Sequence, residues 1–274
     1  MSLVLLNGEL LAAATIALAL PNRGLQFNDG FFETLVLTAG RLRYAADHAA
    51  RMQRAAAVLH LQLPAALSSP DALERTLQRV AEANALAAGS RLRLQLWRTG
   101  GGLYAPATAD VHWLATAVPY APGGASPARA GFAESIRTQY SPLSFCKGPY
   151  ALHYVLAAQE RVARGLDELL LLDAHGHVAE AGAAAVFWLK DDELFTPALA
   201  SGCVAGVRRA HLLRVARQHG LRCHEGLYPA AELLGAEAAF TANVAGIRLL
   251  SHIDATELMS AHPLLTALRG WEAV

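Results

Sequence analysis

Residues Gly165–Glu180 read GLDELLLLDAHGHVAE and give the strongest local indication of architecture. Within them, Glu168–Leu172 is a short apolar run, which is typical of a buried strand. Asp173–His177 predicts a tight turn, because Asp and Gly favour turn conformations. A second strand then begins at Val178, and a helix is predicted before the stretch, over Tyr150–Arg164. A helix followed by buried strands indicates an α/β arrangement.

The rest of the carboxyl-terminal half continues this alternation of helices and strands. Apolar residues at helical spacing predict two further helices, and short apolar runs bounded by turn residues predict the strands. The predicted helices are Val207–His219 and Ala230–Ala238, and the predicted strands are Val178–Leu189, Glu193–Thr196, Leu221–His224, Ala239–Thr241 and Ile247–Ile253.

The amino-terminal half has an α+β pattern. Asn7-Gly8 between two apolar runs predicts a two-residue hairpin. Other predicted elements are the strands Phe31–Thr38, Arg41–Tyr44 and Arg91–Trp97 and the helices Ala45–His60 and Asp71–Ala88. Pro119–Arg129, PYAPGGASPAR, has no periodicity and indicates a linker. We therefore expect a smaller α+β domain over 1–118, a linker over 119–130 and a larger α/β domain over 131–274.

Composition excludes several classes of protein. The chain has 274 residues, 54% of them hydrophobic, which is enough to bury a sizeable core. Its 23 Lys and Arg balance 23 Asp and Glu, so no basic field favours nucleic acid or an anionic membrane. Three cysteines without paired spacing argue against a disulfide scaffold. The apolar run Leu10–Leu20 is too short to span a bilayer and follows no basic segment, so we expect a soluble cytoplasmic protein.

Lysine is rare in this chain, which makes one position prominent. Two of the 23 basic side chains are Lys, namely Lys147 and Lys190. A desolvated Lys can lose its proton and act as an amine nucleophile, whereas Arg cannot. Lys190 precedes Asp191-Asp192 in a predicted turn, where a solvated side chain is the simpler interpretation. Lys147 precedes Gly148-Pro149 and an apolar helix, so it is either such a nucleophile or a surface Lys at a helix start.

Glu180 is the second prominent residue. It lies in the apolar stretch VAEAGAAAVF, Val178–Phe187, where a carboxylate is costly without a partner. It is either a solvent-facing residue of an edge strand or a buried group that pairs with a cation or a protonated ring nitrogen. The nearby His175 and His177 lack acidic or Cys ligands around them, so they indicate a turn and no metal site.

Three segments are candidates to bind an anion. Ser201–Arg209, SGCVAGVRR, leads through Gly206 into a helix start, where backbone N–H groups suit a phosphate. Arg51 lies at the edge of the buried face of its predicted helix and could face a cleft. Arg98 ends a predicted strand before Gly100–Gly102, where it could meet an anion. The alternatives are an ordinary helix entry and two surface arginines.

Six motifs follow one another along most of the chain. They are NRGLQFNDGFFETL (Asn22–Leu35), DHAARM (Asp47–Met52), Lys147 with YVLAAQE (Tyr154–Glu160), GLDELLLLD and GHVAE (Gly165–Glu180), Thr196-Pro197 with GVRR (Gly206–Arg209), and FTANVAG (Phe240–Gly246). In order and spacing they resemble the class IV, fold-type IV, pyridoxal-phosphate-dependent enzymes. That family includes branched-chain aminotransferases, D-amino acid aminotransferase and aminodeoxychorismate lyase. The resemblance implies a two-domain fold-type IV enzyme.

The resemblance also implies the cofactor pyridoxal 5'-phosphate and a role for each candidate. Lys147 would form the internal aldimine and shuttle a proton between the substrate Cα and the cofactor. Glu180 would pair with the pyridine nitrogen and keep it protonated. The implied phosphate-side residues are Arg51, Gly206, Val207, Arg208, Thr241, Ala242 and Asn243. The implied substrate contacts are Arg98 and Tyr150.

Four positions depart from the family pattern. Ala185 stands where Asn is usual, Arg208 where Thr is usual, Asn28 where Gly is usual, and Arg161 where Ala is usual. Arg208 lacks the hydroxyl but keeps its N–H group and adds a charge. We therefore expect cofactor binding to survive.

Three hypotheses for function remain open. The first, which we favour, is a transaminase that moves an amino group from an amino acid to a 2-oxo acid. The second is an aminodeoxychorismate lyase that releases pyruvate and p-aminobenzoate. The third is a catalytically silent cofactor-binding homologue, which Ala185 and Arg208 motivate and the presence of Lys147 and Glu180 opposes. The resemblance further implies a homodimer.

Overall fold

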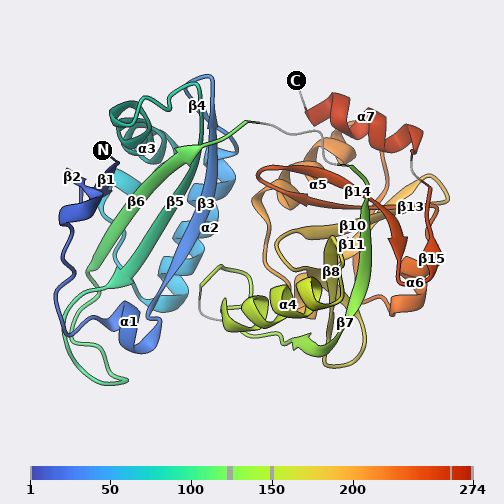
Figure 1. Cartoon of the computed structure of the whole chain (residues 1–274), viewed down its shortest axis with the longest axis horizontal. Coiled ribbons are helices and arrows are strands. Elements are labelled where there is room, and N and C mark those ends of the chain that lie inside the picture. Colours follow the sequence, from blue (N-terminus) through green and yellow to red (C-terminus); the bar gives the residue numbers. More distant parts are fainter. Residues whose placement is uncertain (1, 122–125, 149–150, 260, 273–274) are drawn as a thin grey trace. The chain divides into compact units, whose positions relative to one another are not determined.

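The computed structural model describes residues 2–121, 126–148, 151–259 and 261–272 (Figure 1). The chain divides into two compact units. Unit 1 comprises residues 1–122 with 146–149, and unit 2 comprises residues 123–145 with 150–274. Lys147 therefore packs with unit 1, although the sequence-based boundaries place it in the carboxyl-terminal domain.

Unit 1 is built on an antiparallel sheet with the strand order β2-β1-β6-β5-β3-β4. The predicted hairpin is confirmed, because β1 and β2 pair across Asn7-Gly8. A long pairing joins β3 to β5, from Gly30 opposite Trp97 to Thr38 opposite Gly89. The strands are β1 (Leu3–Leu6), β2 (Glu9–Ala12), β3 (Gly30–Thr38), β4 (Arg41–Leu42), β5 (Gly89–Arg98) and β6 (Val111–Pro119).

Two helices, α2 (Ala45–Leu59) and α3 (Pro70–Ala83), pack against this sheet and against each other (Figure 1). The short α1 (Arg23–Phe27) precedes β3. Ser69 caps α3, since its hydroxyl accepts the Ala72 N–H at 3.2 Å. Pro70 suits the first helical position because no N–H is needed there.

Unit 2 contains a mixed sheet with the order β12-β11-β10-β13-β14-β7-β8-β9, and β15 pairs with β14. The pairs β11–β12, β14–β7 and β7–β8 are parallel, and the other neighbours are antiparallel. The strands are β7 (Ala128–Thr138), β8 (Glu168–Asp173), β9 (Val178–Ala181), β10 (Ala185–Lys190), β11 (Glu193–Pro197), β12 (Cys223–Gly226), β13 (Ala238–Asn243), β14 (Gly246–Ile253) and β15 (Thr256–Glu257).

The sheet of unit 2 has a core on each face. Phe187 belongs to the core that packs with α5 and α7, whereas Trp188 belongs to the core that packs with α6. Successive strand residues point to opposite faces, so these helices cover opposite sides of the sheet. A third cluster packs α4 against β7 and β8. The helices are α4 (Ala151–Ala163), α5 (Val207–Gln218), α6 (Ala230–Leu234) and α7 (Pro263–Glu272).

One predicted helix, Asp71–Ala88, ends early in the structure, at Ala83. The Asn84 Nδ2 donates to the carbonyls of Val80 at 2.7 Å and Leu3 at 2.9 Å, and the Asn84 Oδ1 accepts from the Leu3 N–H at 2.9 Å. These bonds tie the helix end to β1. The early end therefore depends on a partner 81 residues away, which leaves no local sign in the sequence.

Other boundaries also differ from the prediction. The single predicted strand Val178–Leu189 is two strands, because Gly182–Ala184 turns the chain and β9 pairs with β8 while β10 pairs with β13. The predicted helix Ala230–Ala238 ends at Leu234. The predicted linker overlaps β7, which begins at Ala128. Neither β6 nor α7 was predicted from the sequence.

The turn at Asp173–His177 is present as predicted, and the His177 Nδ1 bonds the Asp173 Oδ2 at 2.9 Å. Among the described residues, no group of three or more His, Cys, Asp or Glu side chains is placed to hold a metal ion. Within that same part of the chain, every helix is too short or too polar to cross a membrane.

Candidate active site

The segment that carries Lys147 lies against strand β3 in unit 1. The Phe32 N–H donates to the Lys147 carbonyl at 2.9 Å, and the Asn28 Nδ2 donates to the Gly148 carbonyl at 2.6 Å. Asn28, one of the departures from the family pattern, thus helps to hold this segment. Gly148 has a φ of +133°, which favours glycine, and a Cβ there would lie 3.0 Å from the β3 backbone. The half-buried Lys147 is therefore fixed at a defined point of unit 1.

A buried charge cluster forms at the next residue of β3. Glu33 accepts from the Arg51 Nε at 2.8 Å, the Arg51 Nη2 at 2.5 Å and the His48 Nδ1 at 2.7 Å. All three side chains are buried. Burial alone would raise the pKa of Glu33, but the Arg51 charge and the His48 hydrogen bond lower it to about 2. Glu33 is therefore ionised at neutral pH and fixes the direction of Arg51.

His48 is the neutral member of this cluster. Burial lowers the pKa of His48 despite the neighbouring Glu33. An ionised carboxylate only accepts, so the Nδ1 carries the proton. The His48 Nε2 has no hydrogen-bond partner within the described part of the chain. Burial also raises the pKa of the Cys146 thiol to about 11, so the thiol beside Lys147 stays protonated and is a poor nucleophile.

Glu180 is buried in β9 of unit 2, which excludes the solvent-facing alternative. The Tyr154 Oη donates to the Glu180 Oε1 at 2.6 Å, and the Val204 N–H donates to the Oε2 at 3.1 Å. Burial and the Glu180 charge raise the pKa of the Cys203 thiol to about 11, so this neighbour stays neutral. A carboxylate held in this way in an apolar strand suits a cationic partner such as a protonated ring nitrogen.

Helix α5 begins at Val207, three residues after Val204. Its amino terminus is therefore close in the chain to the residue whose N–H binds Glu180. Gly206 precedes the helix, and no side chain among the described residues caps it. The N–H groups of Val207 and Arg208 belong to the first turn, where intrahelical acceptors are lacking. Such a helix start suits a phosphate, through its N–H groups and its dipole.

The Arg208 side chain is bound by the carboxyl-terminal helix α7. Its Nε donates to the Glu272 Oε1 at 2.6 Å, its Nη2 donates to the Glu272 Oε2, and its Nη1 donates to the Asn243 carbonyl at 3.1 Å. The side chains of Arg208 and Glu272 are 8% and 5% exposed. This corrects the expectation that Arg208 adds charge at a phosphate, because Glu272 neutralises that charge. Its N–H group remains part of the helix start.

Breaking this pair is expected to destabilise the fold. Glu272→Gln leaves Arg208 buried without its counter-charge, at a cost of about 3–5 kcal/mol. Adding Arg208→Met removes both charges and is expected to restore at least about half of that loss. Urea unfolding of the wild type, both single variants and the double variant measures the coupling. Arg217→Met, which breaks a half-exposed pair between Arg217 of α5 and Glu225 of β12, should cost no more than about 1 kcal/mol. Strictly additive losses would contradict the pairing.

The end of β13 lies at the same helix start, because the Asn243 carbonyl binds Arg208. Ala242 packs in the core that contacts α5, so Thr241 and Asn243 point to the other face of the sheet. The Ala242 side chain is therefore enclosed, and only its backbone could meet a ligand. Ala185, where the family usually has Asn, lies opposite Ala242 in β10.

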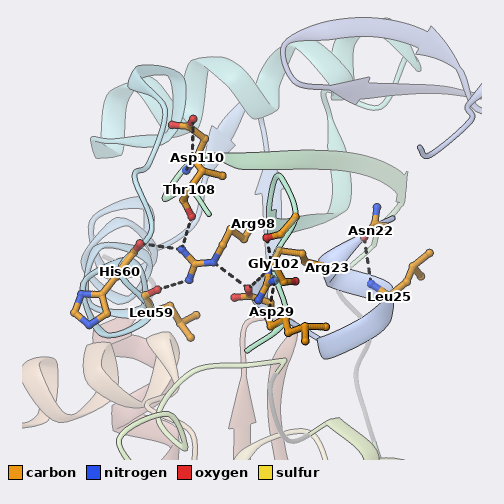
Figure 2. Close-up of polar contacts among 12 residues, drawn as sticks. Asn22, Arg23, Leu25, Asp29, Leu59, His60, Arg98, Gly102, Thr108 and Asp110 are labelled. Carbon is orange, nitrogen blue, oxygen red and sulfur yellow. Dashed lines mark hydrogen bonds and ion pairs between the residues drawn. The ribbon is translucent and has the colours of Figure 1, made fainter. Parts of the chain in front are cut away.

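Figure 2 shows Arg98 bound to the protein's own backbone. Its Nε donates to the Asp29 Oδ2 at 2.9 Å, and its Nη atoms donate to the carbonyls of Leu59 at 2.5 Å and of His60 and Thr108 at 3.1 Å. The side chain is 5% exposed. Arg98 thus ties the end of β5 to the end of α2, to Asp29 before β3 and to the loop before β6, and these contacts engage the side chain that was expected to bind a substrate.

A second arginine shares the same carboxylate. The Arg23 Nε donates to the Asp29 Oδ2 at 2.7 Å, and its Nη1 donates to the carbonyls of Gly102 at 2.7 Å and Leu103 at 2.8 Å (Figure 2). Burial opposes ionisation of Asp29, but Arg98 and Arg23 lower its pKa below the ordinary value. The Asp29 cluster therefore fixes the glycine-rich loop after β5 to α1.

Some site residues were missed, and one cannot be placed. Tyr150 lies outside the described residues, so its expected substrate contact is not located. Glu33, His48 and Tyr154 lie inside the motifs that carried the resemblance, but no role was assigned to them. Their partners are 15 to 26 residues away in the chain. The one usable signal was a polar residue, His48, on the apolar face of its helix.

Comparison with known proteins identifies the family. Residues 30–253 match the class IV aminotransferases. The chain belongs to this family. An aminodeoxychorismate lyase of Vibrio harveyi is 25% identical over 87% of this chain and 88% of that protein. A D-alanine aminotransferase of Bacillus licheniformis is 26% identical over 95% and 91%. A branched-chain-amino-acid aminotransferase of Pseudomonas aeruginosa is 31% identical, but over 39% of this chain and 35% of that protein.

A solved structure has the same fold. The branched-chain amino acid aminotransferase of Escherichia coli matches with a TM-score of 0.87, over 98% of this chain and 92% of that chain. The sequence identity is 19%, so this likeness shows the fold. The class IV enzyme described here therefore has the fold-type IV architecture that the motifs implied.

Proposed function

We propose that this class IV enzyme uses pyridoxal phosphate to move an amino group from an amino acid to a 2-oxo acid. The observation that carries the proposal is the arrangement of Glu180 and the start of helix α5 within unit 2. The buried Glu180 binds the Val204 N–H, and three residues later the uncapped helix α5 begins. A buried carboxylate close to a helix start fits the two ends of the cofactor, its basic ring nitrogen and its phosphate.

Each residue then has a defined task. When bound, pyridoxal phosphate supplies an electron sink that allows the Cα–H bond of an amino acid to break. Lys147 would bind the aldehyde carbon, and its amine would move the proton at the substrate Cα. Glu180 would hold a proton at the ring nitrogen. The backbone of Gly206–Arg208 and of Thr241–Asn243, with the Arg51 guanidinium, would bind the phosphate. Tyr150 remains a proposed substrate contact.

A binding experiment tests the proposal. The purified protein is mixed with pyridoxal phosphate, freed of excess, treated with borohydride and digested. We expect a visible absorption band before reduction, and after reduction a covalent adduct on the peptide that carries Lys147, identified by mass spectrometry. A protein that shows neither band nor adduct would overturn the proposal.

Aminodeoxychorismate lyase is the second candidate function. The Vibrio harveyi lyase and the Bacillus licheniformis aminotransferase both match most of this chain, at 25% and 26% identity. A transaminase needs a 2-oxo acid as amino acceptor, whereas a lyase releases pyruvate without one. Pyruvate formed from aminodeoxychorismate in the absence of added 2-oxo acid would favour the lyase. Turnover of amino acids that depends on the acceptor would favour the transaminase.

We further propose a homodimer in the cytoplasm, which the family resemblance supports. Light scattering at several protein concentrations measures the mass in solution. We expect twice the mass of the chain.

A further inference from the structure

We propose that Tyr154 is a positioning residue, which fixes the Glu180 carboxylate and keeps a shared proton on the ring nitrogen opposite it. The inference rests on the function proposed above for Glu180. Its basis is the 2.6 Å hydrogen bond from the Tyr154 Oη to the Glu180 Oε1 within unit 2. None of the roles implied by the family resemblance includes Tyr154.

Helix α4 brings Tyr154 to this position. Ala157, one turn later on the same face of α4, packs with Leu169 and Leu171 of β8, and the Tyr154 ring packs against the same cluster. Leu171 is also the residue opposite Glu180 in the β8–β9 pairing. Cross-strand partners point to the same face, so the carboxylate and α4 lie on one side of the sheet.

The phenol ring is held independently of its hydrogen bond. The centroid of the His153 ring lies 4.0 Å from that of Tyr154, and the Tyr154 side chain is half-buried. Packing therefore sets the position of the hydroxyl, and the carboxylate meets a donor already in place.

The two Glu180 oxygens have donors on different elements. Oε1 binds Tyr154 of α4, and Oε2 binds the Val204 N–H of the segment before α5. Contacts at both oxygens fix the plane of the carboxylate. A hydrogen bond to the charged form also disfavours its protonation. The Tyr154 hydroxyl is a side-chain donor to Glu180, and the neighbouring Cys203 thiol is neutral.

The test is a titration of Glu180 in the cofactor-free protein. Infrared difference spectra follow the carboxyl band that disappears in Glu180→Gln. In Tyr154→Phe, the midpoint of Glu180 protonation should rise by about one to two pH units, as expected when a charged group loses a hydrogen bond. Tyr140→Phe, at a side chain 66% exposed, should leave the midpoint unchanged. An unchanged midpoint in Tyr154→Phe would overturn the proposal.

Turnover of the loaded enzyme gives the second readout. Tyr154→Phe is expected to lower kcat about tenfold with little change in KM. The variant would weaken the protonation of the ring nitrogen, which the chemical step needs, and would leave substrate binding unchanged. An unchanged kcat would also overturn the proposal. Failure of the wild type to bind pyridoxal phosphate would instead refute the proposed function, and the titration would still report on the hydrogen bond.

A further measurement covers the case in which Tyr154→Phe does not fold. Fluorotyrosine in place of tyrosine keeps the ring and the hydroxyl but makes the phenol a stronger donor. The midpoint of Glu180 protonation should then fall. A midpoint that stays in place would contradict the assignment of Tyr154.

Discussion

Lys147→Ala is expected to reduce amino transfer about 10,000-fold or more. Lys147 is proposed both to bind the aldehyde carbon of the cofactor and to move the proton at the substrate Cα, so its loss removes both functions. The measurement is turnover that depends on an added 2-oxo acid, at saturating amino acid and pyridoxal phosphate. The fold should survive, because the hydrogen bonds to the Lys147 and Gly148 carbonyls are backbone contacts that the substitution leaves in place.

Lys190→Ala is the matched control, because Lys190 is the other lysine of the chain. It lies beside the β10–β11 turn, 40% exposed, and pairs with the exposed Glu232 at 3.6 Å. Its loss should leave turnover within about twofold of the wild type, as for most surface changes. Turnover of Lys147→Ala within about tenfold of the wild type would refute the assignment.

Glu33→Gln is expected to give a large loss of stability. It removes the charge that neutralises the buried Arg51, and it replaces one of the two oxygens that accept from Arg51 and the buried His48 with an amide donor. Removing one partner of a buried ion pair costs about 3–5 kcal/mol, which is a large part of the stability of a typical domain. Urea unfolding at neutral pH measures the change. Glu82→Gln, at an exposed site on α3, should change the unfolding free energy by no more than about 0.5 kcal/mol.

The pH dependence of stability gives an independent check on Glu33. Its pKa falls from an ordinary value of 4.5 to about 2 in the fold. A lowered folded-state pKa contributes stability that is present above pH 4.5 and is lost as the pH falls toward 2. The wild type should therefore lose more stability than Glu33→Gln across this window. Parallel acid profiles for the two proteins would contradict the buried ion pair.

Several elements follow from local sequence alone. The hairpin at Asn7-Gly8, the buried strand within Gly165–Glu180 and the helix start at Val207 each depend on residue type and short-range spacing. The same kind of information selected Lys147 from its rarity and Glu180 from its apolar surroundings. Where a boundary depends on a distant partner, as at Asn84 with Leu3, the prediction was wrong.

The arginines show the limit of such reasoning. Arg98 and Arg208 were both expected to meet a ligand, and both are bound by the protein itself. Asp29 lies 69 residues from Arg98, and Glu272 lies 64 residues from Arg208. Spacing in the chain cannot show which charges are neutralised, because the partners meet only when separate elements pack.

The order of the motifs was therefore enough to assign the family and its fold. Each motif contains the residue types that a strand, a turn or a helix start requires at that point of the chain. It was also enough to choose Lys147 and Glu180 as candidates. The folded chain was needed to show that Glu33 holds Arg51 and that Tyr154 holds Glu180. Those contacts arise because α2 packs on β3 and α4 packs over β8. The residue spacing within one helix or strand does not show which other element it packs against.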